Sequence, residues 1–231
     1  MQKAKAQIGW ACACLALNGT ILAGALPPVV RLAQEGRPLL EIVVSDDASE
    51  RTAAAATDLA NYLERISGGT FAVTTGDGSR GIAVGVYPRD FPELDLGPEF
   101  APENPLRREE YLLRSHAGGI WLLGATDLAV EHAVWDLLYR LGYRHFFPTA
   151  HWECIPSDPS PSLAVTAFER PAFHRRQIAS AYGQRPAQRT ALRLWNLRNR
   201  GNSGLSVGSS HVYGRIVRDN AETFARHPEY F

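Results

Sequence analysis

Residues 120–148 constrain the fold more than any other segment, because a strand, a turn, a helix and a second strand follow one another there without a long loop. Residues 120–123 are an apolar run that predicts a strand, and Gly124 ends it. Thr126 can begin a helix, since its side-chain oxygen can accept a hydrogen bond from an unpaired backbone N–H. The segment therefore predicts a helix that follows directly on a strand and packs back against it.

The helix after Thr126 has one apolar face and a defined end. Gly142 stands where a left-handed residue closes a helix, residues 143–147 predict an aromatic strand, and Pro148 ends it. The apolar residues at helical spacing are Val130, Ala133, Val134, Leu137, Leu138 and Leu141.

The preceding residues predict the rest of one domain. A helix is expected over residues 50–67, with Ala56, Leu59, Leu63 and Ile66 on its apolar stripe. Strands are expected over residues 41–45, 71–75, 82–86 and 110–115, the last forming a hairpin with 120–123. Strands that alternate with only two helices predict an α+β fold, in which a mixed β-sheet carries both helices on one face.

Residues 76–81 match the glycine pattern GxGxxG, but they do not predict a dinucleotide site. Such a site requires the loop to open a helix whose N-terminus meets the pyrophosphate. Here a β-rich segment, residues 82–86, follows at once. We interpret the glycines as a hairpin turn.

The N-terminus has the pattern of a secretory signal over residues 1–25. Lys3 and Lys5 precede a mostly apolar stretch, and the small residues Ala23 and Ala25 fit a cleavage site. The apolar stretch is too short and too interrupted to predict a membrane span. We expect a secreted or periplasmic protein with no membrane attachment after cleavage.

Loss of residues 1–25 would leave Cys154 as the single cysteine, because Cys12 and Cys14 lie in the signal. One cysteine allows no internal disulfide and no cysteine-based metal site. The pattern His151-Trp152-Glu153 lacks the Cys-x-x-Cys partner of a zinc deaminase. We therefore expect no metal and no cofactor.

The sequence changes in character after residue 169. Residues 171–176 predict a strand, and residues 186–200 predict a helix with Pro186 at its start and Gly201 after its end. These elements have too few neighbours to bury their apolar sides. The predicted division is a signal at 1–25, an α+β domain at 37–168 and the beginning of an incomplete domain at 169–231.

Several segments together resemble known carbohydrate-active proteins. The sequences AAAATDLANYLERISGG, GIAVG, EYLLRS, GIWLLGATDLAVEHAVWDLLYRLGYRHFFP and PAFHRR resemble the N-terminal domain of α-glucuronidases. They are also similar to the non-catalytic domain before the barrel of family 20 β-hexosaminidases. The tail SSHVYGRIVRDNAETFARHPEYF resembles a bacterial secreted family, domain of unknown function 4838.

The resemblance implies an accessory domain of a secreted glycoside hydrolase-like protein acting on carbohydrate. It implies that residues 169–231 are the start of a truncated (β/α)8 barrel, with residues 171–176 as its first strand, and that the partners are carbohydrate and the remainder of the barrel. Glycoside hydrolysis needs two carboxyl groups, whereas after residue 170 the chain has only Asp219, Glu222 and Glu229. The catalytic residues are therefore unknown, and we expect this chain alone to be inactive.

Two residues are candidates for substrate binding. His211 follows a Gly/Ser-rich segment where a barrel places an active-site loop. Arg175 and Arg176 end the predicted first strand, and one of them would point inward, where it could bind a sugar hydroxyl or a carboxylate. Of the two arginines, Arg175 is the candidate. A loop histidine without function remains open for His211, and an ion pair with a missing part of the barrel remains open for the arginine.

A second function is open because residues 170–218 contain ten arginines and no acidic residue. This region could bind a polyanion such as an acidic polysaccharide. The export signal argues against nucleic acid, and Tyr182 and Trp195 are too few aromatic residues for a base-stacking platform.

The signal pattern gives a first testable prediction. Protein exported from the cell should begin at Leu26, since the small residues before it fit the signal peptidase site. N-terminal sequencing of the exported protein measures this directly. Cytoplasmic protein that retains Met1 would contradict the prediction of export.

Overall fold

The computed structural model describes residues 26–96, 100–176, 183, 185–202, 204 and 213–230. Its centre is a six-stranded mixed sheet in the order β12-β7-β8-β6-β4-β5. Strands β4, β5, β6 and β8 are parallel, whereas β7 is antiparallel to β8 and β12 is antiparallel to β7. The bounds are Ile42–Val44 (β4), Val73–Thr75 (β5), Gly81–Val86 (β6), Tyr111–His116 (β7), Gly119–Gly124 (β8) and Thr166–Glu169 (β12).

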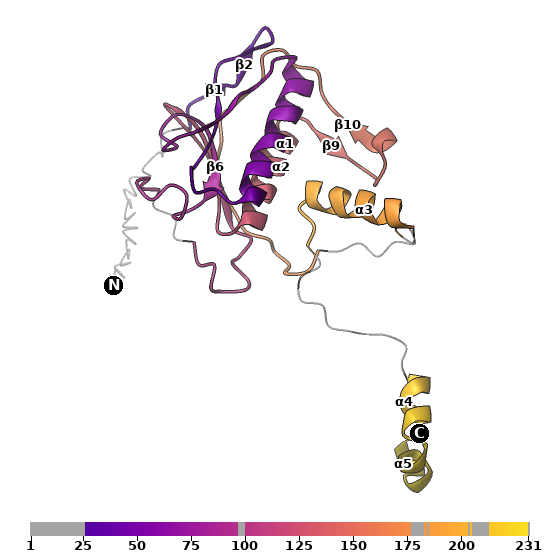
Figure 1. The fold of residues 1–231 in the computed structure, drawn as a ribbon. Coiled ribbons are helices and arrows are strands. Elements are labelled where there is room, and N and C mark those ends of the chain that lie inside the picture. The colour runs from indigo at the N-terminus through magenta and orange to yellow at the C-terminus, as the bar shows by residue number, and fades with distance from the viewer. Residues whose placement is uncertain are drawn as a thin grey trace, which may run out of the picture.

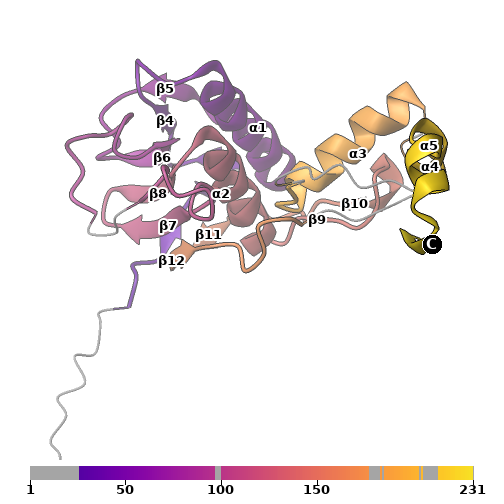
Figure 2. The ribbon, with the colours of Figure 1, turned by 90° about the horizontal axis from the view of Figure 1, so that it is seen from below.

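Two helices, α1 (Glu50–Ser67) and α2 (Asp127–Arg140), lie side by side on one face of this sheet (Figures 1 and 2). Between them and the sheet lies the main core, in which the predicted stripe residues Leu59 and Leu63 are fully buried. Burial of such side chains contributes about 1.5–3 kcal/mol each. The predicted α+β fold with two helices on one face is confirmed.

The opposite face of the sheet has a smaller core without a helix. Phe91, Leu96 and Phe100 pack against Leu112 and Leu123 of the two central hairpin strands. These three residues belong to the irregular connection between β6 and β7, so its described residues cover part of the second face.

Side chains cap the starts of both helices, and the predictions made for Thr126 and Gly142 are confirmed. Ser49 accepts a hydrogen bond from the Thr52 N–H at the start of α1, and Thr126 accepts one from Ala129 at the start of α2. Gly142 adopts φ +104°, a conformation that L side chains rarely adopt, so the chain turns away after α2. The signals at these positions are local, which is why the sequence predicted them.

Three sequence predictions are wrong in detail. Residues 76–80 are not a hairpin turn, because β5 and β6 both run parallel to β4 on its two sides. Residues 143–147 do not extend as one strand, since β9 includes only Arg144–His145 and pairs with β10 (Glu153–Cys154) outside the main sheet. The main sheet also contains β12, which the sequence did not predict. Its residues alternate only between exposed and half-buried, so the strand has no clearly buried face.

Two further short strand pairs lie outside the main sheet, and they begin before the predicted domain start at residue 37. β1 (Val30–Arg31) pairs with β11 (Ser162–Leu163), and β2 (Ala33–Gln34) pairs with β3 (Arg37–Pro38). A short 3-10 helix, η1, occupies Ala150–Trp152. We call residues 30–169 the body.

Residues 170–176, 183 and 185–202 are the described part of a segment that we call the arm, and they contact the body. The strand predicted over 171–176 is wrong, because only Arg176 pairs there, in an isolated bridge with Asn202. Helix α3 (Pro186–Arg198) forms as predicted and lies against the body near α2, β9 and β10 (Figure 2). The start of a barrel is therefore not seen in the described residues and stays a prediction.

The last described residues form short helices. These are α4 (Tyr213–Asp219), α5 (Ala221–Arg226) and the 3-10 helix η2 (Pro228–Tyr230), and they pack on one another (Figure 1). Across the described residues, no helix combines the length and apolar character needed to cross a membrane.

The close pairing of β6 and β8 gives a stability prediction. Gly119 lies opposite Gly81, and a Cβ atom on Gly119 would lie 1.9 Å from the Gly81 carbonyl oxygen. Replacement by alanine must push two central strands apart, so Gly119→Ala should lower the free energy of unfolding by about 1–3 kcal/mol. Urea denaturation followed by circular dichroism measures the change.

Gly214→Ala is the matched control, because a Cβ atom there meets nothing within 4 Å. This control should leave the unfolding midpoint of the body unchanged. Equal stability of both variants and the original chain would contradict the close approach of β6 and β8.

Candidate functional site: the interface between body and arm

Acidic side chains of the body and arginines of the arm meet in the interface between the two parts. Three carboxylates, those of Glu109, Asp136 and Glu153, are almost completely buried, and each binds one arginine of the arm beyond residue 175. A fourth, the fully buried Glu110, binds Arg170 at the start of the arm and Arg107 of the body. An isolated buried charge is very costly, so these contacts neutralise groups that could not be left alone. Neither set of residues is close to the other in sequence.

Glu109, just before β7, binds several arm groups. Its carboxylate pairs with the Arg176 guanidinium and accepts a hydrogen bond of 2.7 Å from the Asn202 amide. The backbones of Arg176 and Asn202 also bond to each other in both directions, at 2.8 and 3.1 Å. The carboxylate thus holds together two parts of the arm that lie on either side of α3.

His132 on α2 lies beside this carboxylate, with its Nδ1 atom 3.4 Å from Glu109 Oε2. Burial, reinforced by the positive charges of Arg176, Arg200 and Arg51, lowers the pKa of His132 to about 3. The imidazole is therefore neutral at pH 7, and Glu109 depends on Arg176 for its counter-charge.

Asp136, one turn further along α2, is the second buried carboxylate. Arg200 of the arm donates to it at 2.6 Å, and Arg140 donates at 3.0 Å. Burial and the negative charge of Asp136 raise the pKa of the nearby Tyr111 hydroxyl. The guanidinium of Arg200 also lies 5.2 Å from the ring centre of Tyr139, which adds a cation–π contact.

Glu153 on β10 is held by two tyrosines and by Arg198 at the end of α3. Its Oε1 atom accepts hydrogen bonds from Tyr62 at 2.5 Å, Tyr143 at 2.9 Å and Arg198 at 2.9 Å. Burial opposes ionisation of Glu153, but these bonds outweigh it, so the pKa of Glu153 lies below its usual value. The carboxylate is saturated and acts as an anchor for the arm.

Neutral contacts add to these ion pairs. The Trp195 indole and the Asn199 amide on the arm both donate to the His145 carbonyl oxygen, at 2.9 and 3.0 Å. A single carbonyl of β9 therefore receives two arm side chains, and α3 is fixed along its C-terminal half.

A cavity of about 590 Å³ remains between body and arm. Its wall is mixed in character, with tyrosines, one buried histidine and several arginines among its lining residues. The lining residues are Tyr111, His132, Asp136, Tyr139, Arg140, Arg144, Glu169, Arg170, Pro171, Arg176, Asn199 and Arg200.

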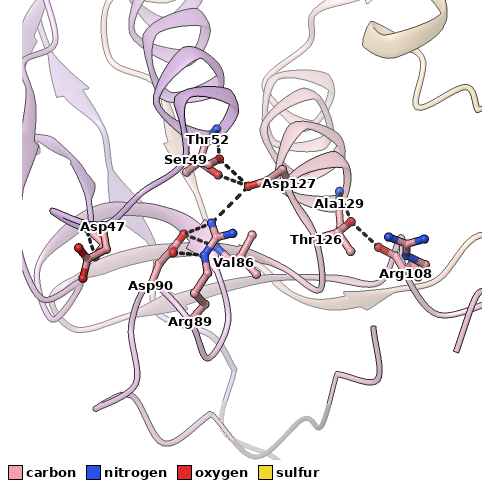
Figure 3. Close-up of polar contacts among 11 residues, drawn as sticks. Asp47, Ser49, Thr52, Val86, Arg89, Asp90, Arg108, Thr126, Asp127 and Ala129 are labelled. Atoms are coloured by element: carbon pink, nitrogen blue, oxygen red, sulfur yellow. Dashed lines mark hydrogen bonds and ion pairs between the residues drawn. The ribbon is translucent and has the colours of Figure 1, made fainter. Parts of the chain in front are cut away.

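A second polar cluster lies at the carboxyl ends of the parallel strands, where ligands bind in many α/β proteins (Figure 3). Asp127 at the start of α2 accepts hydrogen bonds from Ser49 at 2.7 Å, Thr52 at 3.0 Å and Arg89 at 3.3 Å. Arg89 also binds the buried Asp90, which accepts from the Val86 N–H. These groups satisfy one another, so the cluster joins the two helix starts and has no free chemistry.

The predicted binding residues are only partly located. His211 lies outside the described residues. Arg175 is exposed and lines a different hollow, with Phe173 and Trp195. Arg176 is the arginine that points to the body, and it binds Glu109 rather than an open space. Pairing within the protein is the role that the structure shows for Arg176, and substrate binding by His211 or Arg175 stays a prediction.

Sequence reasoning missed Glu109, Asp136 and Glu153, although a signal was present. Acidic residues outnumber basic ones over 41–110, and arginines dominate 170–218. Opposite charge in two segments of one chain indicates that they can pair. Sequence alone does not specify which residues meet.

The acidic residues after residue 170 do not form a hydrolytic pair. Asp219, Glu222 and Glu229 are exposed on the small terminal helices, and Asp219 and Glu229 are near Arg218 and His227 at 3.5 and 2.9 Å. Within the described part of the chain, no cluster of histidine, cysteine and acidic side chains could hold a metal ion.

Comparisons with known proteins give matches only at the level of structure. No family model and no curated protein sequence matches the chain. A family GH115 4-O-methyl-α-glucuronidase with specificity for decorated arabinogalactans matches with a TM-score of 0.55 and 16% identity. The match covers 75% of this chain and 25% of that enzyme.

Two β-hexosaminidases also match, more weakly. The Streptomyces plicatus N-acetyl-β-hexosaminidase has a TM-score of 0.41 at 21% identity, and the GH20 enzyme of Streptomyces coelicolor A3(2) has 0.39 at 22%. Each match covers 66% of this chain and 25% of the enzyme. The chain thus shares a fold with part of the GH115 enzyme. It spans about a quarter of the length of each of these enzymes.

The buried ion pairs predict a large coupling between body and arm. Arg176→Met leaves the Glu109 carboxylate without its counter-charge, so the free energy of unfolding should fall by about 2–3 kcal/mol. Adding Glu109→Gln removes the unpaired charge and should recover part of this loss. Urea denaturation of both single variants and the double variant gives the coupling energy, expected at about 1–3 kcal/mol.

Arg215→Met is the control for this cycle, because Arg215 and its partner Asp219 are both more than half exposed. Its effect should stay within about 0.5 kcal/mol. Strict additivity of the Arg176 and Glu109 substitutions would show that the arm is not held by this pair.

Proposed function

We propose that the chain is an accessory, non-catalytic part of an exported, glycoside hydrolase-like protein that processes carbohydrate. The observation that carries the proposal is the body fold, which a quarter of a GH115 α-glucuronidase shares over three quarters of this chain. The sequence resemblance to N-terminal domains of α-glucuronidases and to domain of unknown function 4838 supports the same role. Carbohydrate is then the substrate class of the whole protein.

The carboxylates of the interface support a structural role. Hydrolysis of a glycoside needs two carboxyl groups that flank the scissile bond and remain free to exchange protons or attack. Glu109, Asp136 and Glu153 are instead fixed by arginines and tyrosines. A carboxylate whose oxygens are occupied in this way stabilises a fold and is poorly suited to catalysis.

In this proposal the arm has a positioning role. It is attached to the body by ion pairs of Arg198 and Arg200 at the C-terminal end of α3, with Glu153 and Asp136, and by the ion pair of Arg176, before the helix, with Glu109. We propose that this attachment fixes the position of a catalytic barrel beyond the arm relative to the body. The partner is then the remainder of that barrel.

Polyanion binding by the arginine-rich region is the alternative, and the structure removes much of its basis. Arg170, Arg176, Arg198 and Arg200 all form ion pairs with carboxylates of the body. The exposed arginines of α3 include Arg189 and Arg193. Strong retention on heparin that is lost in Arg189→Gln/Arg193→Gln would favour this alternative.

The proposal is tested by an activity assay on the purified full chain. Aryl glucuronides and aryl N-acetylhexosaminides should be hydrolysed no faster than in a buffer blank, because the buried carboxylates of the interface are held in ion pairs. Turnover above the blank that is lost in Glu109→Gln or Asp136→Asn but kept in Asp219→Asn would overturn the accessory role. Circular dichroism of each variant shows whether it still folds.

A further inference from the structure

We propose that the cavity between body and arm is a binding site for a small hydroxylated oxyanion, such as a sugar acid or a hydroxy acid. The cavity is about 590 Å³, a size that suits a ligand of one sugar ring. Its wall combines guanidinium groups, tyrosines and a buried imidazole, which are groups that can form hydrogen bonds with a polar ligand. This site is independent of the proposed accessory role, because it requires neither a barrel nor hydrolysis.

The charge of the wall favours an anion. Five arginines line the cavity, namely Arg140, Arg144, Arg170, Arg176 and Arg200. The carboxylates that pair with them are Asp136, Glu169, Glu109 and Glu110. The arginines thus exceed their carboxylate partners by one, which leaves a formal charge of +1 in a partly enclosed space.

Arg144 carries this remaining charge. Its guanidinium donates to the carbonyl oxygens of Tyr139 and Tyr143 at 2.6 and 2.7 Å, and it lies 3.6 Å from the ring centre of Tyr139. Among the described residues it has no carboxylate partner. The two carbonyls hold one edge of the guanidinium in place, so its remaining N–H groups are available to a carboxylate, sulfate or phosphate oxygen.

His132 indicates that the ligand also carries a hydroxyl group. Its side chain is almost completely buried, and its Nε2 atom has no hydrogen-bond partner among the described residues. The neutral ring places its proton on Nδ1, beside the acceptor-only carboxylate of Glu109. Nε2 is then an acceptor without a partner in a side chain that lines the cavity, and because the atom has almost no accessible area, a ligand hydroxyl would reach it only after a small shift of the neighbouring side chains.

The test is isothermal titration calorimetry on the full chain with four probes at matched ionic strength. Galacturonate carries a carboxylate and hydroxyls, galactose carries hydroxyls only, sulfate is an oxyanion without a hydroxyl, and chloride is the salt control. Galacturonate should bind at one site per chain and at least 10-fold more tightly than galactose. Sulfate should bind more weakly than galacturonate and compete with it.

Arg144→Gln should weaken galacturonate binding at least 10-fold, because it removes the unpaired charge. Arg37→Gln removes the same charge from an exposed position on β3 and should leave binding unchanged. Arg144→Lys keeps the charge and should retain part of the affinity. Equal losses in Arg144→Gln and Arg37→Gln, or equal affinity for galactose and galacturonate, would overturn the proposal.

A measurement on the unaltered chain covers the case in which Arg144→Gln does not fold. Nuclear magnetic resonance of the arginine side chains and of the His132 ring should show saturable shifts on addition of galacturonate, confined to groups that line the cavity. Shifts spread over exposed arginines such as Arg37, or no saturable shift, would overturn the site.

Discussion

The attachment of the arm depends on the need to neutralise three buried carboxylates. Glu109, Asp136 and Glu153 come from a loop, a helix and a short strand of the body, and each is nearly inaccessible to water. The arm supplies one arginine to each. A buried carboxylate without a counter-charge costs free energy, because it has lost its hydration. The state in which the arm arginines pair with these carboxylates is therefore favoured over one in which the carboxylates stay buried and unpaired. The arm is thus part of the same folded unit, although it contributes no strand to the sheet.

The same requirement explains why the arm is ordered around α3. Arg176 and Asn202 pair through their backbones and both bind Glu109, while Arg200 reaches Asp136. Trp195 and Asn199 share the His145 carbonyl. Several weak polar contacts that converge on a few fixed acceptors replace the apolar core that the arm lacks. The cavity between the two parts exists because long arginine side chains bridge a space that no apolar side chain fills.

The chain shares its fold with part of a glycoside hydrolase. Its own function depends on the side chains that this fold positions. At the carboxyl ends of the strands, the polar groups around Asp127 satisfy one another and connect α1 to α2. The chemically open groups lie elsewhere, in the wall of the cavity, where Arg144 and His132 have unused hydrogen-bonding capacity. An accessory domain with its own small ligand site is consistent with both observations.

The sequence by itself determined the local elements of the body. The apolar stripes of α1 and α2, the caps at Ser49 and Thr126, the positive φ of Gly142 and the β7–β8 hairpin all follow from residues within a few positions of one another. Only the tertiary structure decided the crossing from β5 to β6, the addition of β12, the irregular path of residues 171–176 and the residues of the candidate site. Glu109 and Arg176 meet across a long stretch of chain, and the choice of partner depends on where packing places each charge. A charge pattern along the sequence shows that two segments can attract each other, but the three-dimensional packing selects the atoms that touch.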